Sequence, residues 1–159
     1  MKTIAALLMT AVLLSCGKSD PKVSKPMTGT KYKVGQVWNY QTREGEAGSH
    51  IFIVRSDPDE KLGVIYHIYV DGIRIKNPHS PSGGQDHLPH SPVSEKTLDD
   101  SVTSLITNQA DALPDIAEGY AAWREAYANN HGGVFSIPVK QIIQYIEDIV
   151  NGKSDKGNP

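Results

Sequence analysis

A histidine-rich stretch in the middle of the chain has the residue types best suited to bind a metal ion. Residues 77–92, NPHSPSGGQDHLPHSP, contain half of the six histidines and one carboxylate: His79, Asp86, His87 and His90. Neutral imidazoles beside a carboxylate can bind zinc, nickel or copper. However, His87 and His90 are not placed on a helix that would align both rings, and no second motif completes a site. A solvent-exposed loop stiffened by prolines is the favoured interpretation, and a metal site is the alternative.

Motifs that mark common enzyme classes are missing from the sequence. It contains no Gly-x-Ser-x-Gly turn, no His-Glu-x-x-His helix and no phosphate-binding loop. The adjacent carboxylates Asp99–Asp100 and Glu147–Asp148 would diverge by about 100° on a helix, so neither pair could share a substrate. The sequence therefore predicts no catalytic residue and no cofactor, although dispersed catalytic residues would escape such a search.

The single cysteine, Cys16, follows a positively charged start and a short apolar run. The run covers residues 4–14, too few for a spanning helix, which needs about 20 apolar residues. A charged start, an apolar segment and a small residue before a break are the features of a cleaved export signal. A lone cysteine in an exported chain has no disulfide partner within that chain, so another role is expected for it.

The tetrapeptide LLSC, residues 13–16, resembles the lipobox of bacterial lipoproteins. The resemblance implies that residues 1–15 are removed as a signal peptide and that Cys16 is acylated. Two or more hydrocarbon chains anchor a protein firmly, since each buried methylene contributes about 0.8 kcal/mol. Gly17 is not the aspartate associated with inner-membrane retention, so the resemblance implies an outer-membrane anchor that faces the periplasm.

The composition and the two chain ends predict one globular domain. The 159 residues have a formal net charge of −2, which gives no reason to expect binding to nucleic acid. Residues 16–31 join the lipidated cysteine to a polar stretch with prolines and glycines, which predicts a flexible tether. Residues 152–159 are equally poor in apolar side chains and predict a disordered tail. A single domain over residues 32–151 can fold without a disulfide.

Alternating apolar residues predict an antiparallel sheet in the first half of this domain. Even-numbered residues from Val64 to Val70 should point to one face and odd-numbered residues from Ile65 to Tyr69 to the other, with His67 partly buried. The Asp71-Gly72 pair predicts a hairpin turn. VGQVWNY and HIFIVR supply two earlier strands, so a meander of about four strands is expected. The VGQVWNY strand resembles the opening strand of small bacterial envelope proteins, a resemblance that implies no functional residue.

Apolar residues recur at helical spacing in the second half. Ser94, Asp115 and Pro138 are start signals for three helices, whose apolar stripes cover residues 98–106, 116–127 and 139–150. Residues 134–137 predict a short fifth strand before the last helix. Strands followed by helices indicate an α+β fold.

Several side chains on these elements have an expected environment. Trp38 and Trp123 lie on apolar stripes, which favours a place in the core over a ligand-stacking role. In the last helix, Ile146 belongs to the predicted core stripe and Glu147 to the solvent-exposed face.

These patterns predict a lipid-anchored, periplasm-facing α+β domain that acts as a non-enzymatic protein-binding module. An envelope-assembly accessory and an immunity-type inhibitor both fit this class. The expected partners are the membrane, through the lipid on Cys16, and an envelope protein. The alternative is a lipoprotein that binds zinc, copper or nickel through residues 77–92, and an enzyme with an unrecognised site is the third possibility.

Overall fold

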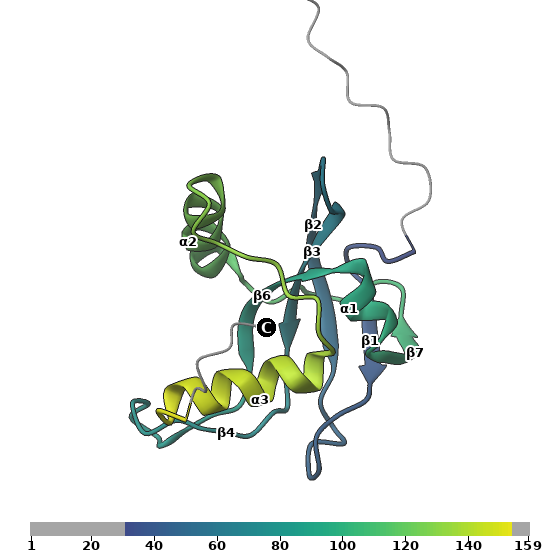
Figure 1. Ribbon diagram of the computed structural model, residues 1–159. Coiled ribbons are helices and arrows are strands. Elements are labelled where there is room, and N and C mark those ends of the chain that lie inside the picture. Colours follow the sequence, from purple (N-terminus) through teal and green to yellow (C-terminus); the bar gives the residue numbers. More distant parts are fainter. Residues whose placement is uncertain (1–30, 154–159) are drawn as a thin grey trace, which may run out of the picture.

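The computed structural model describes residues 31–153, so Cys16 and the predicted signal peptide lie outside the described residues. The fold is α+β, as predicted, with a five-stranded sheet in the order β6-β3-β2-β1-β7 and three helices (Figure 1). Every pairing in this sheet is antiparallel. The sheet strands are β1 (Val37–Tyr40), β2 (Ile51–Asp59), β3 (Gly63–Val70), β6 (Leu88–Ser94) and β7 (Val102–Thr107).

The predicted alternation in β3 separates the two faces of the sheet. Tyr66 and Ile68 belong to the main hydrophobic core, whereas His67 and Tyr69 have aromatic partners outside that core. His67 is fully buried, with 0% of its surface exposed, where the sequence predicted partial burial. One face of the sheet therefore packs against the hydrophobic core, and the other carries a polar aromatic cluster.

Helix α3 (Val139–Val150) covers the core face. Its apolar residues recur every three or four positions, and Val139, Ile142 and Ile143 are completely buried in the core. Ile146 and Val150 are partly buried against the same core, so the predicted stripe is confirmed.

The elements after β3 differ from the predicted ones in several places. Residues 73–76 end in β4 (Ile75–Lys76), which pairs with β5 (Gly84–Gln85) in a separate small sheet instead of returning along β3. The strand next to β3 is β6, which begins inside the stretch of residues 77–92 that was predicted to be a loop. Residues 134–137 form only a single bridge, between Phe135 and Val93, instead of a strand.

The helix that the apolar pattern predicted over residues 98–106 is shorter in the structure. Helix α1 (Glu95–Asp99) begins after Ser94, whose hydroxyl accepts a hydrogen bond from the amide of Thr97, as its N-cap position predicts. The chain then continues as β7, because residues 102–107 pair with β1. Their β-branched and apolar side chains suit an edge strand as well as a helix, and the pairing decides between the two.

A largely buried ion-pair network joins the loop between β1 and β2 to β4 and α3. Arg43 binds Glu46 at 2.6 Å and Glu147 at 2.5 Å. Glu46 also accepts a hydrogen bond from the amide of Arg74, and Glu147 accepts one from the amide of Lys76. The expectation that Glu147 is fully exposed is wrong, because its side chain pairs with Arg43. The sequence pattern did not indicate this pair, since Arg43 lies 104 residues earlier in the chain.

Helix α2 (Ala117–Ala128) stands apart from α3, beside the β2–β3 hairpin (Figure 1). None of its residues is fully buried. It faces the side of the sheet that carries His67, since Tyr120 and Trp123 both contact that ring. Among the helices of residues 31–153, none has both the length and the hydrophobicity that crossing a membrane requires.

Candidate functional site

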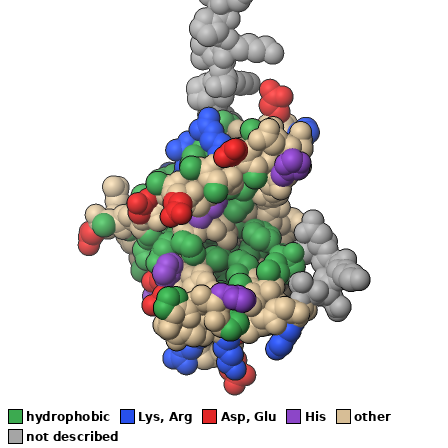
Figure 2. All heavy atoms as spheres, turned by 90° about the vertical axis from the view of Figure 1, so that its left-hand side faces the viewer, with side chains coloured by type: hydrophobic (Ala, Val, Ile, Leu, Met, Phe, Trp, Pro, Cys, Tyr) green, Lys and Arg blue, Asp and Glu red, His purple; other side chains and the backbone are tan. Residues whose placement is uncertain are grey.

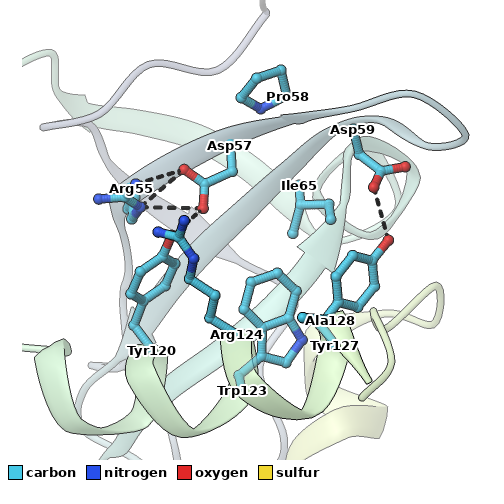
Figure 3. A pocket seen from close by; sticks show the side chains of 10 residues that line it. All are labelled: Arg55, Asp57, Pro58, Asp59, Ile65, Tyr120, Trp123, Arg124, Tyr127 and Ala128. Carbon is cyan, nitrogen blue, oxygen red and sulfur yellow. Dashed lines mark hydrogen bonds and ion pairs between the residues drawn. The ribbon is translucent and has the colours of Figure 1, made fainter. Parts of the chain in front are cut away.

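An open cleft of about 370 Å³ lies between α2 and the β2–β3 hairpin. Aromatic side chains of α2 form one wall, and charged side chains of β2 form the other (Figure 3). We call it the α2 cleft and define it by its lining residues: Arg55, Asp57, Pro58, Asp59, Ile65, Tyr120, Trp123, Arg124, Tyr127 and Ala128.

Two local features of the sequence bring α2 to this position. The carboxylate of Asp115 accepts a hydrogen bond from the amide of Ala117 at 2.8 Å, which satisfies a donor in the first turn of the helix. Gly119 lies so close to β6 that a Cβ atom there would come 2.7 Å from Cβ of His90. Glycine at this position therefore lets the helix approach the strand closely enough for its aromatic side chains to reach the sheet.

The carboxylate of Asp57 connects the two walls of the cleft. The Tyr120 hydroxyl donates to Asp57 at 2.6 Å, and the Arg55 guanidinium lies 2.8 Å from the same carboxylate. Arg55 also stacks over the Tyr120 ring, 4.3 Å from its centroid. Burial raises the pKa of Asp57, but the hydrogen bonds from Arg55 and Tyr120 outweigh it and hold the pKa below its usual value. Asp57 is therefore ionised at neutral pH and fully occupied by its neighbours.

A pair of histidines lies beneath the cleft. Nδ1 of His67 is 3.0 Å from Nε2 of His90, and the two rings are stacked with centroids 5.2 Å apart. Nε2 of His67 is 3.2 Å from Asp57, but it is not aligned for a hydrogen bond and has no other partner among the described residues. The tautomers that fit both contacts have His90 donating to His67 and the Nε2 proton of His67 facing the carboxylate.

Burial keeps both histidines neutral. Burial, together with a smaller contribution from the neighbouring His90, lowers the pKa of His67 to about 4 against the opposing effect of Asp57. Burial also lowers the pKa of His90. Tyr120 and Trp123 close over the His67 ring, with centroids 4.9 Å and 4.7 Å away, so a proton on His67 would have little access to water.

Acidification should therefore destabilise the fold. Between pH 6.5, the ordinary pKa of histidine, and pH 4, His67 binds a proton in the unfolded chain but not in the folded protein. The stabilisation from neutral His67 is therefore fully present above this range, and the free energy of unfolding falls as the pH drops through it. At pH 5 the loss from His67 should be about 2 kcal/mol. Urea denaturation of the full chain at pH 7 and pH 5 measures it.

The control for this experiment is a comparison of two histidine variants. His67→Gln should remove most of the loss between pH 7 and pH 5, whereas His79→Gln should keep it, because His79 is exposed. An equal loss of stability in all three proteins would contradict the assignment to His67.

One cation at the cleft is not neutralised by a carboxylate. Arg124 makes no ion pair among residues 31–153, and its one hydrogen bond is a 3.5 Å contact with the Tyr120 hydroxyl. Asp59, in contrast, accepts hydrogen bonds from the amides of Lys61 and Leu62 and from the Tyr127 hydroxyl. The cleft thus offers an exposed guanidinium beside the stacked rings of Trp123 and Tyr127, whose centroids are 4.8 Å apart.

The structure does not bring the predicted metal ligands together. His90 pairs with His67, whereas Asp86 and His87 pair with each other at 2.7 Å. His79 is exposed, and its amide donates to the side chain of Asn77. Within residues 31–153 there is no group of three or more His, Cys, Asp or Glu side chains that could hold a metal ion. The predicted lipidation site, Cys16, lies outside the described residues.

Sequence reasoning missed most of this site. Trp123 was expected in the core, but it is partly exposed and donates from its indole nitrogen to the carbonyl of Gly133. Trp38 is partly buried against the core. The side of the molecule that faces left in Figure 1 carries hydrophobic side chains in its middle with histidines around them (Figure 2). A signal for the cluster was present in the odd-numbered positions of β3, where His67 interrupts an apolar face.

Comparisons with protein-family models, with curated proteins and with solved structures found no match for the chain. The function therefore rests on the α2 cleft and on the amino-acid sequence.

Proposed function

We propose that the protein is a non-enzymatic binding module that is anchored to the outer membrane through Cys16, faces the periplasm and recognises an envelope protein at the α2 cleft. The anchor and the location rest on the lipobox of residues 13–16. The binding role rests on the α2 cleft. An envelope-assembly accessory and an immunity-type inhibitor both remain within this proposal.

The observation that carries the proposal is the partial exposure of the aromatic wall. Helix α2 buries none of its residues fully, although it carries Tyr120, Trp123 and Tyr127 on one stripe. Tyrosine, tryptophan and arginine are the residue types most enriched at the energetic centres of protein interfaces. A helix that holds three aromatic side chains against an open cleft, with Arg124 beside them, has the composition of such a centre.

The cleft also supports binding over catalysis. Its carboxylates are already engaged: Asp57 by Arg55 and Tyr120, and Asp59 by two amides and Tyr127. The histidines beneath it are paired with each other under the aromatic rings. These groups are arranged to fix the shape of the site. The metal-binding alternative stays a prediction. It is not favoured by the contacts of the four residues concerned, which are His79, Asp86, His87 and His90.

Capture of partners from detergent-solubilised envelopes tests the proposal. Trp123→Ala should reduce the capture of a partner about tenfold or more, because truncation of a central aromatic side chain in an interface commonly costs about 2 kcal/mol or more. Tyr145→Ala on α3 is the matched control, since Tyr145 packs against Phe135 on another element. Circular dichroism should show both variants folded. Equal capture by the wild type and Trp123→Ala would rule out the α2 cleft as the binding site.

A further inference from the structure

The second half of β2 has an open edge. Strand β1 pairs with β2 only at Ile51 and Phe52. Two backbone hydrogen bonds extend the contact to Ile53, whose carbonyl accepts from the amide of Gly35 and whose amide donates to the carbonyl of Gln36. Strand β3 pairs with β2 along its other side as far as Asp59. Residues 55–59 of β2 therefore have a strand neighbour on one side only, among the residues that the structure describes.

The alternation of the backbone shows which groups point outward from this edge. In an antiparallel pair, alternate residues direct both their N–H and C=O groups toward or away from the partner strand. Pro58 has no N–H, and proline within a strand is confined to positions whose nitrogen faces away from the ladder. Ser56, two residues earlier, directs its N–H the same way. The edge thus offers one donor, at Ser56, and two carbonyl acceptors, at Ser56 and Pro58.

The same alternation places charged side chains in the α2 cleft. Arg55, Asp57 and Asp59 lie on the face that turns toward α2, and Pro58 lies on the other side of the strand (Figure 3). A chain that pairs with this edge would therefore lie next to the cleft and could place alternate side chains against it.

The hollow beside β2 is long enough for several extended residues. The α2 cleft shares Arg55 and Tyr120 with a hollow of about 330 Å³ near Pro114, and Tyr127 with one of about 480 Å³ near Asn130. Together the three follow the whole of α2, whose 12 residues correspond to about 18 Å. About five residues of extended chain cover that distance.

The charged residues of the α2 cleft indicate which charge a bound partner segment should carry. Asp57 and Asp59 are satisfied by their neighbours, whereas Arg124 has no carboxylate partner among the described residues. A guanidinium beside aromatic rings favours a carboxylate that approaches next to an apolar side chain. An acidic segment therefore fits better than a basic one.

From these observations we propose that an extended segment of a partner protein adds as a strand to the edge of β2 at Ser56 and places an acidic side chain against Arg124. This inference rests on the proposed binding role of the α2 cleft and specifies how that cleft is used. Main-chain hydrogen bonds along an exposed edge would supply affinity, and the cleft would supply specificity through alternate side chains.

The test uses a phage-displayed library of random 12-residue peptides, selected against the full-length protein in detergent. A synthetic peptide from the selection is then measured by calorimetry against three variants. Ser56→Pro removes the outward N–H and should weaken binding tenfold or more, whereas Ser56→Ala keeps that N–H and should bind like the wild type. Arg124→Glu should also weaken binding tenfold or more, and replacing the acidic residue of the peptide by lysine should restore it.

The peptide itself provides a second measurement that does not depend on the folding of Ser56→Pro. Methylation of single backbone nitrogens in the peptide should abolish binding at alternate positions and leave it unchanged between them. If Trp123→Ala abolishes binding but Ser56→Pro and the methylated peptides bind normally, strand addition is wrong and the proposed function stands. If Trp123→Ala binds normally, both fail. A selection that yields no binding peptide would also overturn the strand-addition inference.

Discussion

Replacing Arg43 by alanine should lower the free energy of unfolding by about 3–5 kcal/mol, the cost expected when one partner of a buried ion pair is removed. Arg43 is the only cation that contacts both Glu46 and Glu147 within the described residues, and the side chain of Glu46 is only 2% exposed. Without Arg43, Glu46 would remain as a buried charge held only by the amide of Arg74. Denaturant titration of the full chain measures the loss.

Arg74→Ala is the matched control for Arg43→Ala. Arg74 takes part in the network through its backbone, whose amide donates to Glu46 and whose carbonyl accepts from Arg43, and its side chain is exposed. Its truncation should change stability by no more than about 0.5 kcal/mol. A similarly small effect of Arg43→Ala would show that the network does not hold the β1–β2 loop to α3.

Replacing Cys16 by serine should leave an unprocessed precursor or an unacylated product, because lipid transfer needs the thiol before the signal is cleaved. A product without acyl chains loses about 0.8 kcal/mol for every methylene that would have been buried. Two chains of ordinary length make this loss large enough to shift a processed but unacylated product out of the membrane fraction. Cell fractionation with immunoblotting measures the distribution, and mass spectrometry of the wild type should find acyl chains on Cys16.

The control for the anchor is Ser24→Ala, which lies in the predicted tether and should stay with the membranes. Wild-type protein that begins at Gly17 without lipid would contradict the lipid anchor.

The sequence alone was sufficient to predict an element where the residue pattern fits only one type of secondary structure. The alternation from Val64 to Val70 and the stripe on α3 each fit one element, and both are confirmed. Residues 102–107 fit two elements, because their apolar spacing over a short window matches a helix and their β-branched residues match a strand. Only the pairing with β1, about 65 residues earlier, resolves that choice.

Strand β6 was missed for a related reason. Pro89 and Pro92 argue against a strand in the sequence, but β6 lies at the edge of the sheet, where missing N–H groups are tolerated. The candidate site was missed because its members come from β2, β3, β6 and α2. No spacing in the sequence relates Asp57 to Tyr120, 63 positions later, or His67 to His90.

The way α2 is attached has a consequence for how the protein moves. The helix is held by side-chain hydrogen bonds, ring contacts and the close approach at Gly119, and not by residues fully buried in the core. Segments of this kind open locally at a fraction of the free energy that global unfolding requires. We therefore expect α2 to open locally at a lower cost than the sheet and α3, in which case the size of the closed cleft would not limit the size of the segment that it can admit.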